Sequence, residues 1–155
     1  MDLATIIALV IAIYGAFLST LTYVRTRART EIQVKSSVDL VKIYGTVEPV
    51  ISLVAQNLGS TKVTFRSFPA LLLPGGKRLI DTGPIWMGAS FPCVLEPRDS
   101  VTVSMQISKL VKTLKQEGYS GRLQLTGLFQ DALDKHHTSE PFDFDIDRWS
   151  KEAGS

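Results

Sequence analysis

An uncharged stretch of 22 residues dominates the amino-terminal end of this chain. Residues 3–24 contain no charged side chain, and 17 of these residues are aliphatic or aromatic. A helix of this length spans roughly 33 Å at about 1.5 Å per residue, which matches a hydrocarbon core of about 30 Å. The rest of the 155-residue chain is too small to surround such a helix with protein on all sides. We therefore expect residues 1–24 to form a transmembrane anchor.

A cleaved signal peptide is the main alternative for this segment. Such a peptide needs a basic amino-terminal region, an apolar stretch of about 7–15 residues and a cleavage site with small residues. Here only Met1 and Asp2 precede the stretch, which is too long and runs directly into Tyr23, Val24 and Arg25. The sequence therefore predicts an anchor that is retained.

The charges that flank the stretch predict its orientation. Arg25, Arg27 and Arg29 follow it within a basic juxtamembrane segment, residues 25–35, whereas Asp2 precedes it. Basic residues resist translocation, so we expect the C-terminal domain in the cytoplasm and the amino terminus outside. The three arginines are then placed to contact anionic lipid headgroups, at about 1 kcal/mol each.

The remaining composition excludes several classes of function. The chain has 17 basic and 15 acidic residues, but residues 36–155 hold 13 of each, so the folded part is formally neutral. A nucleic-acid binder would need a basic stripe on the domain itself, and we expect no nucleic-acid partner. The one cysteine, Cys93, excludes an intramolecular disulfide and an all-cysteine zinc site.

Short alternating runs separated by turn residues predict the fold of the soluble part. The clearest strand covers residues 101–107, and residues 57–60 (NLGS) and 74–76 (PGG) are typical turns. About seven or eight strands at this spacing indicate an immunoglobulin-like antiparallel β-sandwich over residues 36–149, followed by a C-terminal tail, residues 150–155. In the first run, Ile32, Val34, Val38 and Leu40 share one face, and in the last run Phe142, Phe144 and Ile146 share another.

One short helix interrupts this mainly β pattern. Ser108 is the predicted N-cap and Gly118 the predicted C-terminal stop. Apolar residues recur at helical spacing and predict the buried face, namely Ile107, Leu110, Val111 and Leu114. Three lysines occupy the other positions and are predicted to face solvent, namely Lys109, Lys112 and Lys115.

The order of these features also resembles a known group of proteins. After the anchor and the arginine-rich exit come LVAQNLG (53–59), VTF (63–65), LEPRDS (95–100), GYSGR (118–122), FQDA (129–132), SEPF (139–142) and DRW (147–149). This order resembles uncharacterised small bacterial single-pass membrane proteins with an N-terminal anchor helix and an immunoglobulin-like domain. The resemblance implies a fold and an anchor, and it implies no catalytic residue.

Candidate catalytic and metal-binding motifs are incomplete. Asp143, Asp145 and Asp147 have the opening spacing of a calcium loop, but Arg148 and Gly154 stand where that loop needs Gly and Glu. The adjacent His136 and His137 would point to opposite faces of a strand, which disfavours one shared metal. The segment 75–77 (GGK) lacks the other residues of a phosphate-binding loop. We therefore expect a protein that is not an enzyme and that carries no metal or cofactor.

Two apolar features are candidates for contacts with partners. Large side chains gather in an irregular segment at Ile85, Trp86, Met87 and Phe91, which suits a partner surface or packing over the core. A stripe of small residues in the anchor comprises Ala4, Ala8, Ala12 and Ala16, and it suits close helix packing in a homo-oligomer.

The sequence as a whole predicts a membrane-anchored interaction module that binds a protein partner. The alternative is an outward-facing, envelope-side domain that binds a ligand or polymer.

Overall fold

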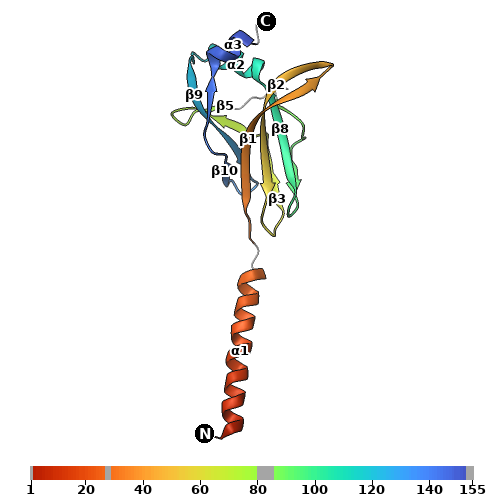
Figure 1. Ribbon diagram of the computed structural model, residues 1–155, viewed down its shortest axis with the longest axis vertical. Coiled ribbons are helices and arrows are strands. Elements are labelled where there is room, and N and C mark those ends of the chain that lie inside the picture. Colours follow the sequence, from red (N-terminus) through yellow and green to blue (C-terminus); the bar gives the residue numbers. More distant parts are fainter. Residues whose placement is uncertain (1, 27–28, 80–85, 153–155) are drawn as a thin grey trace.

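A long helix stands apart from a β-rich domain in the computed structural model, which describes residues 2–26, 29–79 and 86–152 (Figure 1). Helix α1 (Leu3–Thr26) includes a span, Leu3–Tyr23, that is long and apolar enough to cross a membrane. None of that apolar span is buried against the rest of the chain. The Thr20 hydroxyl donates to the carbonyl oxygen of Ala16 at 2.9 Å, so this polar side chain is satisfied within the helix.

The domain contains eleven short or medium strands and two short helices among the described residues. The strands are β1 (Ile32–Ile43), β2 (Thr46–Asn57), β3 (Val63–Phe65), β4 (Ala70–Leu72), β5 (Arg78–Leu79), β6 (Trp86–Met87), β7 (Cys93–Leu95), β8 (Ser100–Gln106), β9 (Arg122–Gln130), β10 (His136–Thr138) and β11 (Phe142–Asp145). The helices are α2 (Ile107–Gln116) and α3 (Ile146–Glu152). The chain is thus mainly β with an N-terminal apolar helix, as the sequence predicts.

The strands form two main sheets and one additional pair, all antiparallel. One sheet has the order β1-β2-β8-β6, and the other has the order β10-β9-β4-β5, with β11 also paired to β9. Strands β3 and β7 form the extra pair. The two short helices lie at the end of the domain that is distant from α1 (Figure 1).

The core contains side chains from both main sheets. Phe65, Phe129 and Phe144 are its largest fully buried residues, and the rings of Phe65 and Phe129 lie 5.2 Å apart. Gly127 of β9 packs against Leu53 of β2, because a Cβ at position 127 would lie 2.6 Å from Cδ2 of Leu53. Leu53 is fully buried, so a larger residue at position 127 would force this side chain to move within the core.

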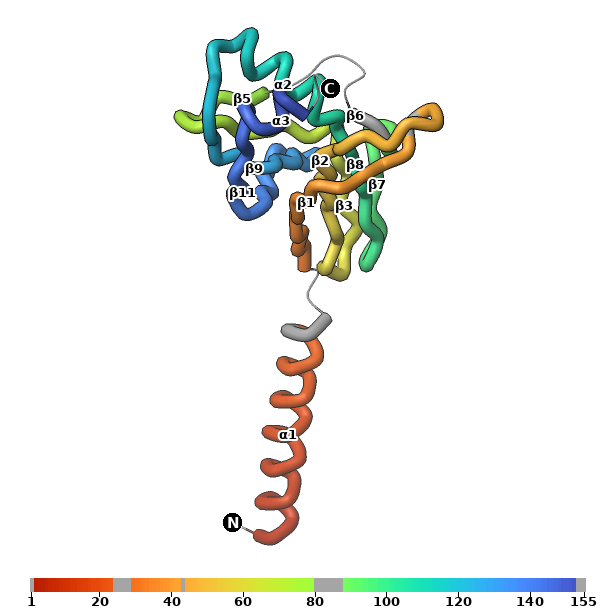
Figure 2. The backbone as a smooth tube through the Cα atoms, turned by 45° about the horizontal axis from the view of Figure 1, so that its top comes forward, coloured from red at the N-terminus to blue at the C-terminus, as the bar shows by residue number. Residues whose placement is uncertain are grey.

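Strands β1 and β2 form a long hairpin that extends beyond the rest of its sheet (Figure 2). Tyr44 and Gly45 both have positive φ, which fits the two-residue turn that joins such strands. Pairing of β2 with β8 stops at Val50. Pro49 precedes this point and has no N–H to donate, so the hairpin continues as a two-stranded ribbon.

The segment that leads from the anchor into the domain is bound to the turn after β2. The Leu58 N–H donates to the Glu31 carbonyl oxygen at 2.8 Å, and the Ser60 N–H donates to the Arg29 carbonyl oxygen at 2.8 Å. The predicted turn at residues 57–60 is confirmed, and the Asn57 side chain accepts the Gly59 N–H at 3.0 Å. This contact attaches the chain close to the anchor exit.

Helix α2 confirms the predicted buried face but not the predicted N-cap. Its four apolar residues are buried, and Gly118, with φ of 86°, follows the helix as the expected stop. The prediction of Ser108 as N-cap is wrong, because the helix begins at Ile107 directly after β8 and Gln106 is the capping residue.

A second helix in the domain was not predicted. The last apolar run continues as a strand only to Asp145, and α3 begins at Ile146. The Asp145 carboxylate accepts the Arg148 N–H at 3.0 Å and so satisfies a free donor at the helix start. The expectation of one short helix in the domain is therefore incomplete.

Candidate functional site

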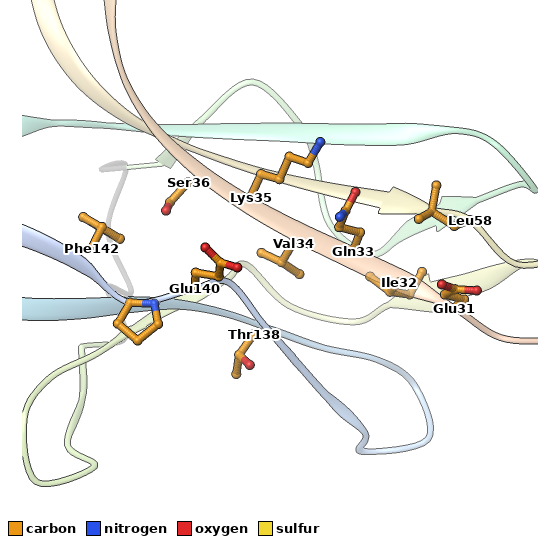
Figure 3. A pocket seen from close by; sticks show the side chains of 11 residues that line it. Glu31, Ile32, Gln33, Val34, Lys35, Ser36, Leu58, Thr138, Glu140 and Phe142 are labelled. Atoms are coloured by element: carbon orange, nitrogen blue, oxygen red, sulfur yellow. The ribbon is translucent and has the colours of Figure 1, made fainter.

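A groove of about 720 Å³ separates the first strand of one sheet from the last strands of the other (Figure 3). One wall is residues 31–36, at the start of β1, and the other is the connection from β10 into β11. Figure 3 shows Val34 of the first wall and Glu140 of the second wall on its two sides. The lining mixes apolar and charged side chains, namely Glu31, Ile32, Gln33, Val34, Lys35, Ser36, Leu58, Thr138, Glu140, Pro141 and Phe142.

The β1 wall presents an unpaired strand edge. Strand β1 is the terminal strand of its sheet, and none of the described residues pairs with its outer side. Its register with β2 runs from Ile32↔Asn57 to Ile43↔Thr46 with no inserted residue, so the edge has no bulge. At the other ends of the two sheets, the edge strands β5 and β6 each have two residues within the described ranges.

The hairpin turn fixes which backbone groups point outward from β1. In a two-residue hairpin the pair that flanks the turn, here Ile43 and Thr46, exchanges hydrogen bonds, and bonded pairs then alternate along the strands. The intervening residues, including Val34 and Ser36, therefore direct N–H and C=O away from β2. These groups line the groove.

Buried serine and glycine contacts hold the opposite wall. Strands β10 and β11 pair with successive parts of β9 on the same side, and residue 139 lies between them. The buried Ser139 accepts the Gly127 N–H at its hydroxyl and donates its own N–H to the Gly127 carbonyl oxygen, both at 2.9 Å. This wall is thus fixed to β9 without a continuous strand.

A second hollow of about 380 Å³ continues along β1 at Val38. Its opposite wall contains Asp145, whose pKa is lowered by the Arg148 N–H and by the Arg122 guanidinium. The Arg148 guanidinium lies 5.3 Å from the centre of the Trp149 ring. The two hollows together follow the chain from Glu31, just before β1, to Val38.

A buried acid–histidine pair supports the turn that precedes β10. Nε2 of His137 lies 2.9 Å from Oδ2 of Asp131, and each side chain is 5% exposed. The other Asp131 oxygen accepts the N–H groups of Leu133 and Lys135, both at 2.9 Å. Burial raises the pKa of Asp131, but these hydrogen bonds outweigh it and hold the pKa below its ordinary value. The pair is a structural element of the turn, because solvent and substrates do not reach it.

Sequence reasoning did not identify this pair or the groove. His136 and His137 do point to opposite faces, since His137 is buried and His136 is exposed beside Arg78. In β10 burial alternates, so that His137 points inward between the exposed His136 and Thr138. The sequence of these three residues does not show which histidine points inward. The groove depends on strand order, which a single sequence does not reveal.

The predicted partner surface is only partly described. Ile85 lies outside the described residues, and Trp86 and Met87 form β6, whose backbone pairs with β8. Phe91 is half-buried against the core, and its ring centre lies 4.7 Å from that of Phe68. For this segment the sequence allowed either a partner surface or packing over the core, and the contact of Phe91 corresponds to packing over the core.

The predicted membrane contacts are distributed along α1 and its exit. The four residues of the alanine stripe, Ala4, Ala8, Ala12 and Ala16, are exposed on α1. Arg25 belongs to α1, whereas Arg27 lies outside the described residues. The Arg29 guanidinium lies 2.8 Å from the Glu31 carboxylate, so Arg29 is ion-paired within the chain.

Outside the groove, the described residues form no cluster of metal-binding side chains and no activated thiol. No group of three or more His, Cys, Asp or Glu residues there is placed to hold a metal ion. Cys93 is half-buried, and burial raises the pKa of its thiol, which is opposite to what a reactive thiolate requires.

No protein-family model matches the chain, and no curated protein is significantly similar to it.

Proposed function

We propose that this chain is a single-pass membrane protein whose β domain is a non-enzymatic module for binding a protein partner. The observation that carries the proposal is the exposure of α1, because none of its apolar span is buried in the chain. An apolar helix of this kind needs a lipid or protein environment to cover it. The open groove at β1 supplies the candidate binding surface.

The proposed location of the domain is the cytoplasmic side of the cell membrane. The support is the basic flank at Arg25, Arg27 and Arg29, opposed by Asp2 at the other end of the helix. An outward-facing domain that binds a ligand or polymer is the alternative. Both versions use the same anchor and the same groove.

The strand order supports an immunoglobulin-like assignment for the domain. In the immunoglobulin sandwich, strands A, B, E and D form one sheet and strands G, F and C form the other. Here β1-β2-β8-β6 corresponds to the first order, and β10-β9-β4 corresponds to the second. The resemblance to bacterial single-pass proteins with such a domain is part of the same proposal.

The chemistry of the site supports binding rather than catalysis. The described acid–histidine pair, Asp131 and His137, is buried, and the Cys93 thiol has a raised pKa. The balanced charge of residues 36–155 argues against nucleic acid as the partner. We propose no metal or cofactor.

Site-specific photo-cross-linking in intact membranes tests this function. A photoreactive amino acid is placed in the full-length chain at Gln33, which lines the groove, or at Lys112, which is exposed on α2 as a matched control. We expect a discrete protein adduct from position 33 and none from position 112. Equal adducts at both positions, or none at either, would contradict a binding module with this surface.

A further inference from the structure

We propose that the outer edge of β1 accepts an extended β-strand from the partner protein, which adds to the β1-β2-β8-β6 sheet. This inference rests on the proposed function, because it states how the membrane-anchored module recognises its partner. The chemistry of the occupant follows from the backbone of β1. Outward N–H and C=O groups at alternate residues are satisfied in full by another strand.

The β1 edge lacks three of the features that normally prevent strand addition, although it carries Lys35, Asp39 and Lys42. Protein sheets protect their edges with short strands, prolines, bulges or charged side chains. Strand β1 has twelve residues, contains no proline and pairs with β2 without a bulge. The edge is therefore a regular template for pairing.

The groove also fits the side chains of an added strand. Its five β1 residues, 32–36, extend roughly 16 Å at about 3.3 Å per residue, and the second hollow extends the groove to Val38. Val38 and Leu40 lie on the same face as the buried Val34 but are 50% and 73% exposed. An incoming strand with apolar residues at every second position would place them beside Val38 and Leu40 on this face of the sheet, and its polar side chains would lie on the opposite face.

A second copy of this chain does not fit the same edge. Strand β1 rises from the anchor end of the domain (Figure 1), so two copies in one membrane have their β1 strands pointing in the same direction. Antiparallel β1–β1 pairing would put the two anchors at opposite ends. Symmetric parallel pairing also fails. In a parallel pair, a residue that directs its N–H and C=O at the partner strand lies opposite a residue whose own groups point away. In a symmetric pair each β1 residue would lie opposite its own copy, so this condition would not be met. These β1–β1 pairings between two copies are therefore excluded, and the occupant that we propose is a strand from a different protein.

Peptide selection on the full-length chain tests the inference. The probe is a phage-displayed library of random twelve-residue peptides, and the target is the full chain in phosphatidylcholine nanodiscs. We expect the selected peptides to alternate apolar and polar residues. Peptides with apolar residues at a spacing of three or four would instead indicate a bound helix and would overturn strand addition.

A proline at Ser36 tests the role of the β1 edge. The Ser36 N–H points away from β2, so Ser36→Pro removes a donor to the incoming strand and keeps the β1–β2 hydrogen bonds. We expect peptide affinity to fall at least about tenfold in Ser36→Pro, to fall less in Ser36→Ala, which keeps the N–H, and to stay unchanged in Lys112→Ala on the exposed side of α2. Equal affinity of Ser36→Pro and wild type would overturn the inference.

N-methylated peptides provide a test that does not depend on a protein variant. Methyl groups on alternate peptide nitrogens block one edge of an added strand, and methyl groups on the intervening nitrogens block the other edge. We expect one methylated series to lose binding and the other to retain it. Equal binding of the two series would overturn strand addition.

Different results would overturn strand addition at β1 and the proposed interaction module. A cross-linked partner that binds equally well to the Ser36→Pro chain would overturn strand addition and leave the interaction module standing. Proline-sensitive peptide binding without any membrane partner would overturn the module and leave the edge as a strand acceptor.

Discussion

Gly59 packs so closely on Arg29 that a Cβ at position 59 would overlap the Arg29 carbonyl oxygen. The same Cβ would lie 2.8 Å from the Glu31 backbone nitrogen. Because the obstructing atoms are backbone, they cannot rotate away as a side chain would. This close approach attaches the segment after the anchor to the turn that follows β2.

Gly59→Ala is therefore expected to detach this segment and lower stability. The overlap should cost about 1–3 kcal/mol, as overpacking does elsewhere in proteins. The measurement is the thermal unfolding midpoint of the full chain in detergent, together with the rate of proteolysis between the anchor and β1. The neighbouring exposed residue supplies the control, since Leu58→Ala should change stability by less than about 0.5 kcal/mol. An unchanged proteolysis rate in Gly59→Ala would contradict the attachment.

The Asp131–His137 pair predicts a specific dependence of stability on pH. The pKa of Asp131 is below its ordinary value of 3.8, so the stabilisation is complete above that value and is lost as pH falls through the lowered pKa. We expect Asp131→Asn to lose about 1–3 kcal/mol at neutral pH, because a buried charged partner is removed. The unfolding free energy of Asp131→Asn should also vary less than that of wild type between pH 5 and pH 2.

The measurement for this pair is chemical denaturation across that pH range. The exposed Asp143 provides the control, and Asp143→Asn should follow the wild-type pH curve. An Asp131→Asn curve parallel to wild type would show that Asp131 is not the titrating group.

The alanine stripe predicts self-association of the anchor. Ala12 and Ala16 lie one turn apart on the exposed surface of α1, where small residues let helix backbones approach closely. Ala12→Leu combined with Ala16→Leu should weaken association of residues 1–30 in a transmembrane-segment assay at equal membrane levels. Ile13→Leu with Phe17→Leu, on another face, should leave the signal unchanged. Equal signals from the stripe variant and wild type would leave a monomeric anchor.

Local patterns in the sequence predicted those elements whose own residues show a clear hydrophobic period. The 3.6-residue spacing of Leu110, Val111 and Leu114 gave the buried face of α2, and the alternation from Val101 to Met105 gave β8. The helical start at Ile146 was missed because Phe142, Phe144 and Ile146 also fit a strand. Only the Asp145 side chain, which accepts the Arg148 N–H, distinguishes the two.

The candidate site could not be predicted from the same patterns. Alternation places Val34, Val38 and Leu40 on one face of β1, and the structure agrees. It does not tell whether another layer covers that face, and here Val34 is buried whereas Leu40 is 73% exposed. The groove arises because β1 and β10 end two different sheets and lie beside each other. That arrangement depends on contacts between residues about 100 positions apart, and local sequence patterns do not encode it.

A reporter at the C-terminus tests the central claim, which is a single membrane anchor with the β domain in the cytoplasm. The full-length chain is fused at its C-terminus to a reporter that works only in the cytoplasm or to one that works only outside the membrane. The basic flank of α1 predicts activity of the cytoplasmic reporter in the membrane fraction. Activity of the outside reporter, or recovery of the fusion in the soluble fraction, would contradict the account.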